Sequence, residues 1–127
     1  MGRVLIADDE PMILEMYGTM VEAGGHHVVG RATNGSEAVA AFHSSAPPPD
    51  VVLMDFRMPG TNGLEATREI LKTHPSAKVV IVSADATVGP ECLPAGAAAY
   101  LEKPVPMVEL LATVTRLSVK GSSVDAG

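Results

Sequence analysis

The chain has 127 residues, of which 46% are hydrophobic, and its formal net charge is −6. This length suits one globular domain with its own core, and the acidic excess disfavours nucleic-acid binding, which depends largely on neutralising phosphates. No apolar run approaches the ~20 residues of a membrane span, and we expect the single cysteine, Cys92, to be a small buried residue of a protein from the reducing cytoplasm.

Short apolar runs alternate with helical patterns along the chain. Runs such as Val4 to Ala7 and Val79 to Val82 are continuous and rich in β-branched residues, which is typical of strands covered on both faces. In chain order, the predicted elements are a strand over 3–7, a helix over 11–23, a strand over 27–32, a helix over 35–43, a strand over 50–54, a helix over 62–73, strands over 78–82 and 98–101, and a helix over 106–117.

The predicted helices have recognisable starts. Pro11 stands where a helix tolerates a missing N–H. Asn34 followed by Glu37 resembles a capping box, and Asn62 can cap the third helix. We expect the first helix to bury one face, which carries Ile13, Met16, Tyr17 and Met20.

Residues 84–96 are a poor match to a helix, because Gly89, Pro90 and Pro94 interrupt them. We expect one or two helical turns there at most. The alternation of elements predicts an α/β fold, a doubly wound (βα)₅ unit with a five-stranded parallel sheet. It forms one domain over 1–119, followed by a small polar tail over 120–127 that we expect to be flexible.

Charged and polar side chains stand where the predicted strands end. Asp8 and Asp9 follow the first strand, Asp55 the third, Ser83 the fourth and Lys103 the fifth. Because the carboxyl ends of parallel strands meet at one edge of a sheet, we expect these side chains to share a pocket. Carboxylates packed together need a positive counter-charge to stay ionised, and a divalent cation can supply it. A site with a few oxygen ligands, in which water fills the remaining coordination positions, suits Mg²⁺ or Mn²⁺ better than zinc. A divalent cation and an ammonium beside a carboxylate oxygen are what attack on a phosphoryl group needs.

Four motifs, each at a predicted strand end, are Ile6-Ala7-Asp8-Asp9-Glu10, Met54-Asp55-Phe56-Arg57-Met58-Pro59-Gly60, Val82-Ser83-Ala84 and Leu101-Glu102-Lys103-Pro104. With them, the chain resembles the receiver domains of bacterial and archaeal response regulators over about residues 3–118. These are the CheY-like phosphoacceptor domains of two-component systems. The resemblance implies a flavodoxin-like sheet with strand order 2-1-3-4-5.

The resemblance also implies a phosphoacceptor site with a bound cation. Asp55 would accept a phosphoryl group from a sensor histidine kinase or a histidine phosphotransfer protein. Asp9, Asp55 and the backbone carbonyl of Arg57 would bind Mg²⁺ directly, and Asp8 would act mostly through metal-bound water. Lys103 would contact the phosphoryl group.

The remaining implied residues border the phosphoryl group. Ser83 and Tyr100 would form a switch pair, in which the hydroxyl moves to the phosphoryl group and the ring turns inward behind it. Ala84 is small enough to leave the approach to Ser83 open. We expect Arg57 and Asp85 to face each other over the pocket and restrict water, which would slow the loss of the phosphoryl group.

We expect the residues after the last predicted helix to hold no effector domain, because they are too few and carry no such motif. We therefore expect a stand-alone receiver, or a fragment of a longer regulator or hybrid kinase, that controls a downstream protein partner or an attached output domain. We expect a monomer or a weak phosphorylation-dependent homodimer that binds neither nucleic acid nor membrane. Its chemistry would be self-phosphorylation and slow self-hydrolysis, so we do not expect an enzyme with an external substrate.

Other interpretations stay open at this point. Asp8 and Asp9 can form a solvated turn, and Ser83 and Tyr100 can be plain structural residues. A phosphohydrolase of the haloacid-dehalogenase type needs a second Asp two residues after its nucleophile, where Arg57 stands, and a flavodoxin-like nucleotide binder needs a Gly-rich loop after the first strand. A pseudo-receiver would act by contact alone. The four histidines lack the spacing of metal ligands, so we expect them at the surface. They are His26, His27, His43 and His74.

Overall fold

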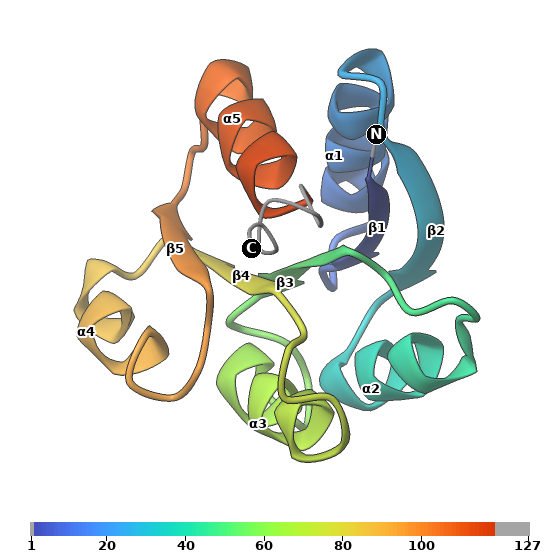
Figure 1. Cartoon of the computed structure of the whole chain (residues 1–127). Coiled ribbons are helices and arrows are strands. Elements are labelled where there is room, and N and C mark those ends of the chain that lie inside the picture. The colour runs from blue at the N-terminus through green and yellow to red at the C-terminus, as the bar shows by residue number, and fades with distance from the viewer. Residues whose placement is uncertain (1, 119–127) are drawn as a thin grey trace, which may run out of the picture.

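The computed structural model describes residues 2–118, and the tail predicted over 120–127 lies outside them (Figure 1). Strands and helices alternate as predicted, and none of the helices in the described part is long and apolar enough to cross a membrane. The elements are β1 (Arg3–Ala7), α1 (Pro11–Ala23), β2 (His27–Ala32), α2 (Gly35–Ser44), β3 (Val51–Asp55), α3 (Gly63–Thr73), β4 (Val79–Ser83), the 3₁₀ turn η1 (Ala86–Val88), α4 (Gly89–Cys92), β5 (Ala99–Glu102) and α5 (Met107–Leu117).

The five strands form one parallel sheet in the order β2-β1-β3-β4-β5. This order confirms the predicted doubly wound topology. Helices α1 and α5 cover one face of the sheet, and α2, α3 and α4 cover the other (Figure 1). The chain reverses its direction of winding between β1 and β3, so the carboxyl ends of these two strands border the crevice where such sheets bind ligands.

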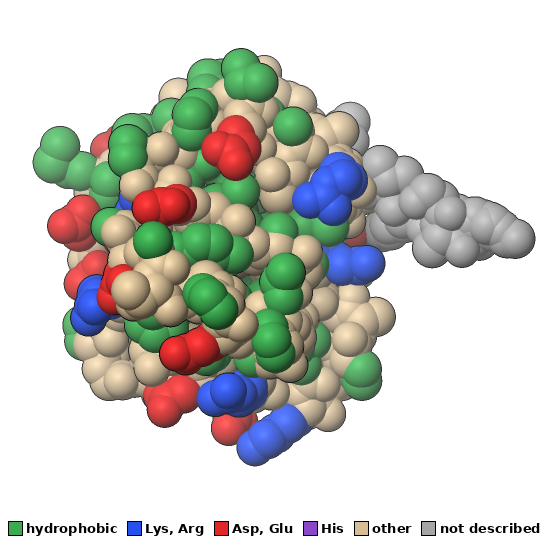
Figure 2. Space-filling model, turned by 90° about the vertical axis from the view of Figure 1, so that its left-hand side faces the viewer, with side chains coloured by type: hydrophobic (Ala, Val, Ile, Leu, Met, Phe, Trp, Pro, Cys, Tyr) green, Lys and Arg blue, Asp and Glu red, His purple; other side chains and the backbone are tan. Residues whose placement is uncertain are grey.

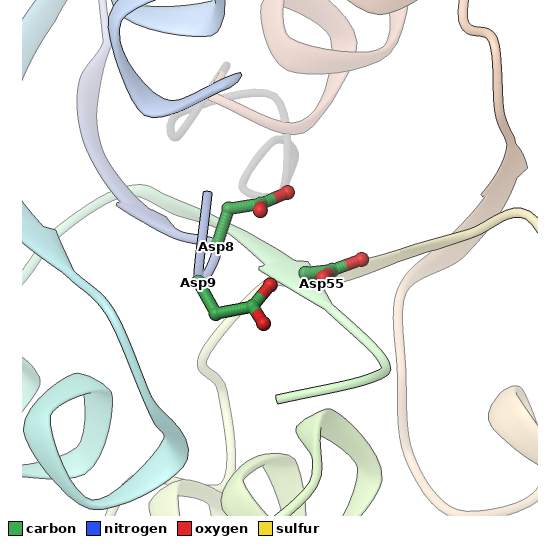
Figure 3. A group of neighbouring side chains, drawn as sticks. All are labelled: Asp8, Asp9 and Asp55. Carbon is green, nitrogen blue, oxygen red and sulfur yellow. The ribbon is translucent and has the colours of Figure 1, made fainter. Parts of the chain in front are cut away.

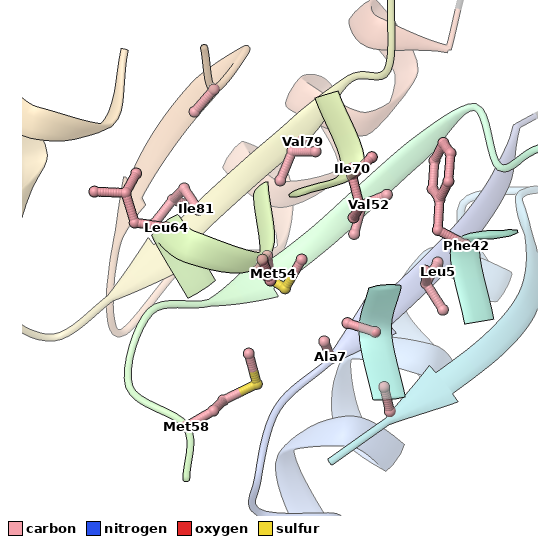
Figure 4. Close-up of a cluster of buried hydrophobic side chains, with 14 of the residues drawn as sticks. Leu5, Ala7, Phe42, Val52, Met54, Met58, Leu64, Ile70, Val79 and Ile81 are labelled. Atoms are coloured by element: carbon pink, nitrogen blue, oxygen red, sulfur yellow. The ribbon is translucent and has the colours of Figure 1, made fainter. Parts of the chain in front are cut away.

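A hydrophobic cluster lies on each face of the sheet. Every residue of β3 and β4 is buried, as their continuous apolar runs predict. Under α2 and α3, Phe42 and Ile70 pack against the sheet (Figure 4), and on the opposite face Leu53 and Val82 pack against α1 and α5. Because both faces are packed, the central strands hold their carboxyl ends in place.

The caps of two helices form as predicted. The Asn34 side chain accepts a hydrogen bond from the Glu37 N–H at 2.8 Å, and Asn62 accepts one from the Glu65 N–H at 2.9 Å. The buried face predicted for α1 is partly wrong, since Met16 is 42% exposed. The buried residues of α1 are Leu14, Tyr17, Gly18 and Val21. One of them is a glycine, which adds nothing to a hydrophobic pattern, so the pattern placed the buried face of the helix wrongly.

The segment between β4 and β5 has little helix, as its prolines and glycine predict. It consists of η1 and the four-residue α4. Asp85 starts η1, because its Oδ1 accepts the Thr87 N–H at 3.0 Å. Cys92 is buried as expected, and its thiol donates to the Val88 carbonyl at 3.2 Å.

The expectation that His26 lies at the surface is wrong. Its ring is buried; Nδ1 accepts the Gly2 N–H at 2.9 Å, and Nε2 is 3.0 Å from Thr115 Oγ1 on α5. Burial lowers the pKa of His26 below its ordinary value. The local sequence gives no sign of this environment, because residues from both ends of the described chain build it.

Candidate functional site

The carboxyl edge of the sheet brings the predicted site residues together. Asp55 ends β3 and Ser83 ends β4, while Asp8 and Asp9 follow β1 and Lys103 follows β5. They adjoin a pocket of about 560 Å³. The residues that line this pocket are Asp9, Glu10, Asp55, Arg57, Ser83, Ala84, Asp85 and Lys103.

Three carboxylates converge at this edge (Figure 3). Asp8, Asp9 and Asp55 each offer an oxygen, and these atoms lie within 4.8 Å of one another. Asp8 is 1% exposed and Asp55 is 7% exposed, whereas Asp9 is open to solvent. An all-oxygen set with one solvent-facing side fits a small divalent cation that keeps part of its water shell, such as Mg²⁺.

Lys103 is shared between two of these carboxylates. Its Nζ lies 3.1 Å from Asp8 Oδ2 and 3.0 Å from Asp55 Oδ1. The other oxygen of Asp8 accepts the Glu10 N–H at 2.9 Å, so both oxygens of Asp8 have partners. Burial opposes the charge of Lys103, but the hydrogen bonds and charges of Asp55 and Asp8 outweigh it and raise the pKa of Lys103.

Asp55, the candidate phosphoacceptor, lies among an excess of negative charges. Burial raises the pKa of Asp55 to about 6, the hydrogen bond from Lys103 opposes this rise, and the charges of Asp8 and Asp9 add to it. One ammonium therefore does not balance the three carboxylates. A divalent cation would supply the missing charge, which agrees with the donor set.

Asp85 connects the hydroxyl, aromatic and basic residues of the site. Its N–H donates to Ser83 Oγ at 3.0 Å, and its carbonyl accepts the Tyr100 hydroxyl at 3.0 Å. Its Oδ2 forms an ion pair with Arg57 Nη2 at 2.9 Å. Arg57 and Asp85 thus face each other, and the exposed Ala84 also lines the pocket.

Sequence reasoning missed several contacts of the site. It placed Lys103 in the shared pocket but did not find its bond to Asp8, which lies 95 residues away. It also missed that Asp85 bonds both Ser83 and Tyr100 through its backbone. The Asp85-x-Thr87 spacing, typical of a side chain that caps a turn, was the one local signal available there.

Comparisons with known proteins agree with this geometry. The model of the response regulator receiver domain family matches residues 4–115. Chemotaxis protein CheY of Thermotoga maritima is 36% identical over 118 residues, covering 91% of this chain and 97% of that protein. Another curated relative is longer, and the chain spans 54% of its length.

Solved structures show the same fold. A receiver domain protein from Clostridium thermocellum superimposes with a TM-score of 0.88 at 28% identity, covering 96% of this chain and 98% of that chain. The response regulator TrrA of Thermotoga maritima, in complex with Mg²⁺ and beryllofluoride, gives a TM-score of 0.84 at 33% identity, covering 92% and 99%. The chain therefore belongs to the response regulator receiver domain family, the phosphoacceptor domains of two-component systems.

Proposed function

We propose that Asp55 is the residue that accepts the phosphoryl group. The observation that carries this proposal is the position of its carboxylate, which ends a buried strand, opens into the pocket and lies 3.0 Å from the Lys103 ammonium. An Asp55 oxygen attacks phosphorus and forms an O–P bond, while the N–P bond of a donor phosphohistidine breaks and the imidazole leaves with a proton. Lys103 then stabilises charge on the phosphoryl oxygens.

Mg²⁺, or Mn²⁺ in its place, is the cation that this site would hold. Asp9, Asp55 and the backbone carbonyl of Arg57 would bind it directly. Asp8 would act through metal-bound water, because Lys103 and the Glu10 N–H already occupy its oxygens. When bound, the cation would neutralise oxygens of the transferring phosphoryl group.

Ser83 and Tyr100 would report the phosphorylation. Ser83 Oγ accepts the Asp85 N–H, and its own O–H would donate to a phosphoryl oxygen, so a shift of the hydroxyl toward that oxygen would act on Asp85. Tyr100 is half-buried and is held at its hydroxyl by the same residue. A movement of Asp85 would therefore reach the tyrosine on β5.

The proposed setting is cytoplasmic signalling. The domain, over residues 1–119, would take its phosphoryl group from a sensor histidine kinase or a histidine phosphotransfer protein and control a downstream protein or an attached output domain. Its own chemistry would be limited to self-phosphorylation and slow self-hydrolysis. We propose a monomer or a weak dimer that forms on phosphorylation.

Incubation with acetyl phosphate, followed by intact-mass measurement, tests the proposed acceptor. We expect one added phosphoryl group that requires Mg²⁺ and is absent from Asp55→Asn. Glu69→Gln, which changes an exposed carboxylate on α3, should be modified like the wild type. A folded protein that forms no adduct, and that also fails to bind beryllofluoride with Mg²⁺, would show a pseudo-receiver instead.

The Arg57–Asp85 ion pair is expected to prolong the life of the phosphoryl group. Changing both residues to Ala removes the side chains that border the pocket and admits water, but keeps the backbone bonds of Asp85. Arg57 is 72% exposed, and exposed pairs contribute at most about 1 kcal/mol, so we expect the adduct to decay about two- to fivefold faster.

The decay of the mass adduct over time measures this effect. The matched control is Glu69→Ala with Lys72→Ala, which removes another exposed ion pair, with an N–O distance of 3.3 Å, on α3. Its decay rate should equal that of the wild type. An equal rate in the Arg57 and Asp85 double variant would contradict the prediction.

A further inference from the structure

A buried histidine joins three segments at the edge of the sheet opposite the pocket. His26 precedes β2, Gly2 precedes β1, and Thr115 belongs to the last turn of α5. The ring accepts the Gly2 N–H on Nδ1 at 2.9 Å, and its Nε2 is 3.0 Å from Thr115 Oγ1. Because Asp55 lies at the other edge, the proposed phosphoryl transfer does not use this histidine.

Gly2 is enclosed by the residues that it contacts. Its carbonyl accepts the His27 N–H at 2.8 Å, so two adjacent histidines bind both polar groups of this glycine. A Cβ built on Gly2 would lie 2.6 Å from Ser118 Cβ and 3.4 Å from Nδ1 of His26. The segment that enters β1 thus fits between the ring and the end of α5, with no room for a side chain.

The last turn of α5 has few other attachments to the core. Val114 is the last buried residue of the helix, and residues 115–118 are exposed or partly buried. Leu117 alone among these four packs partly against the hydrophobic cluster under α1 and α5. The bond between Thr115 and the ring, with the close approach of Ser118 to Gly2, therefore holds this turn in place.

The two bonds of His26 fix its protonation state. A nitrogen that accepts an N–H carries no proton, so the neutral ring has its proton on Nε2 and donates it to the Thr115 hydroxyl. A second proton can bind only at Nδ1, where it would point at the Gly2 N–H. Two donors that face each other at a buried place leave both unsatisfied. The charged ring therefore fits only after Gly2 or the ring itself has moved.

No negative group of the described residues is paired with the ring. None of the ion pairs within residues 2–118 involves His26. Of the charged or titratable residues next to its contacts in the sequence, Glu22, His27 and Arg116 are exposed, and Arg3 is bonded to the loop before β3. Burial lowers the pKa of His26, and the positive charge of the amino terminus lowers it further.

We propose that His26 is a pH-sensitive clasp, which holds the last turn of α5 to the start of β1 while its ring is neutral and releases both when the ring gains a proton. This device is independent of the chemistry at Asp55. Because the pKa of His26 is lower in the folded protein than in the unfolded chain, the stabilisation is present above the ordinary pKa of histidine and is lost as the pH falls through the lower, folded value.

Release of this turn would reach the surface of the molecule. Helix α5 borders the face shown in Figure 2, where hydrophobic and charged side chains mix. The same turn leads into the residues that follow position 118. Acidification would therefore change a surface that a partner can contact and the point from which the chain continues.

A pH titration followed by NMR tests the clasp. Protein labelled with ¹³C in the histidine rings and ¹⁵N in the backbone reports each ring and amide. His26 should titrate at a lower pH than the exposed His27, and the amide signals of Gly2 and of residues 115–118 should shift with the midpoint of the His26 ring. Hydrogen exchange of the amides of residues 116–118, corrected for the intrinsic effect of pH, should become about tenfold faster once the ring is protonated.

Asp55 titrates in a similar range, since its pKa is about 6, so a variant must separate the two groups. His26→Asn places an amide oxygen near the position of Nδ1 but cannot take up a proton, and it should abolish the pH dependence of the α5 amides. His27→Asn, a change of the exposed neighbour, should preserve it. An α5 transition that persists in His26→Asn overturns the proposal, as does a His26 ring that titrates at or above the midpoint of His27.

Thr115→Val gives the decision if His26→Asn does not fold. It removes the hydroxyl bonded to Nε2 from an exposed residue and keeps the bond between Nδ1 and the Gly2 N–H. The Gly2 amide should still follow the ring in this variant, whereas the amides of residues 116–118 should no longer follow it. If these amides titrate as in the wild type, the histidine does not hold the helix and the proposal is wrong.

Discussion

Lys103→Met is expected to destabilise the protein strongly in the absence of divalent cations. Asp8 and Asp55 are almost fully buried, and Lys103 Nζ is within 3.1 Å of both. Removing one partner of a buried ion pair costs about 3–5 kcal/mol. Because the Lys103 side chain is 23% exposed, we expect the low end, about 3 kcal/mol, in urea unfolding with a chelator.

Mg²⁺ should then restore much of the lost stability. A ligand stabilises the folded state according to its concentration relative to its dissociation constant, and without the competing ammonium the three carboxylates attract the cation more strongly. The gain on adding Mg²⁺ should therefore be larger for Lys103→Met than for the wild type. Phosphorylation should be slower, since the phosphoryl oxygens lose a cation.

Lys72→Met is the matched control for the lysine substitution. Lys72 is 70% exposed and pairs with Glu69 on the helix surface, so its loss should change the stability by less than about 0.5 kcal/mol. It should leave the response to Mg²⁺ unaltered. If Lys103→Met matched this control in the chelator, the ammonium would not be the counter-charge of the buried carboxylates.

Gly63→Ala is expected to damage both the fold and the site. Gly63 begins α3, and its N–H donates to the Phe56 carbonyl at 2.8 Å. An added Cβ would overlap the carbonyl oxygen of Asp55 and lie 3.0 Å from Phe56 Cα. These are backbone atoms of a buried strand end and cannot rotate away, so we expect a loss of about 3 kcal/mol, the upper part of the range for overpacking, and slower phosphorylation of Asp55.

Gly18→Ala separates this effect from the loss of a glycine in general. Gly18 is also buried in a helix, but an added Cβ would meet the guanidinium of Arg31, 2.8 Å away. That group is the end of a flexible, exposed side chain and can move. With the higher helix propensity of Ala, by about 1 kcal/mol, Gly18→Ala should be neutral or stabilising. Equal urea midpoints for the two variants would contradict the expected clash at Gly63.

The fold follows from local patterns because this topology repeats one simple unit. Continuous β-branched runs predict strands buried on both sides, and Asn34 and Asn62 mark helix starts that the structure confirms. The predicted ends of β3 and β4 differ by one residue, since Asp55 and Ser83 still belong to the strands. A hydrophobic pattern ends at the last apolar residue, whereas the sheet hydrogen bonds continue through a polar one.

The site was partly predictable for a different reason. In a parallel sheet every strand end lies at one edge, so the proximity of Asp55 and Lys103 follows from the topology. The bond between Asp8 and Lys103 and the burial of His26 depend on distances between segments far apart in the chain. Such distances follow from side-chain packing, which no local pattern contains.

Asp55 and Ser83 end the two strands whose residues are all buried, so the central sheet holds the backbone of both residues. Displacing that backbone requires separation of the central sheet, which belongs to the most stable cooperative unit of a protein. The segment from Asp85 to Cys92 has short helical turns and several exposed residues, features of regions that open at low free energy. The chemistry is thus tied to global stability, while the neighbouring segment is free to fluctuate without unfolding the domain.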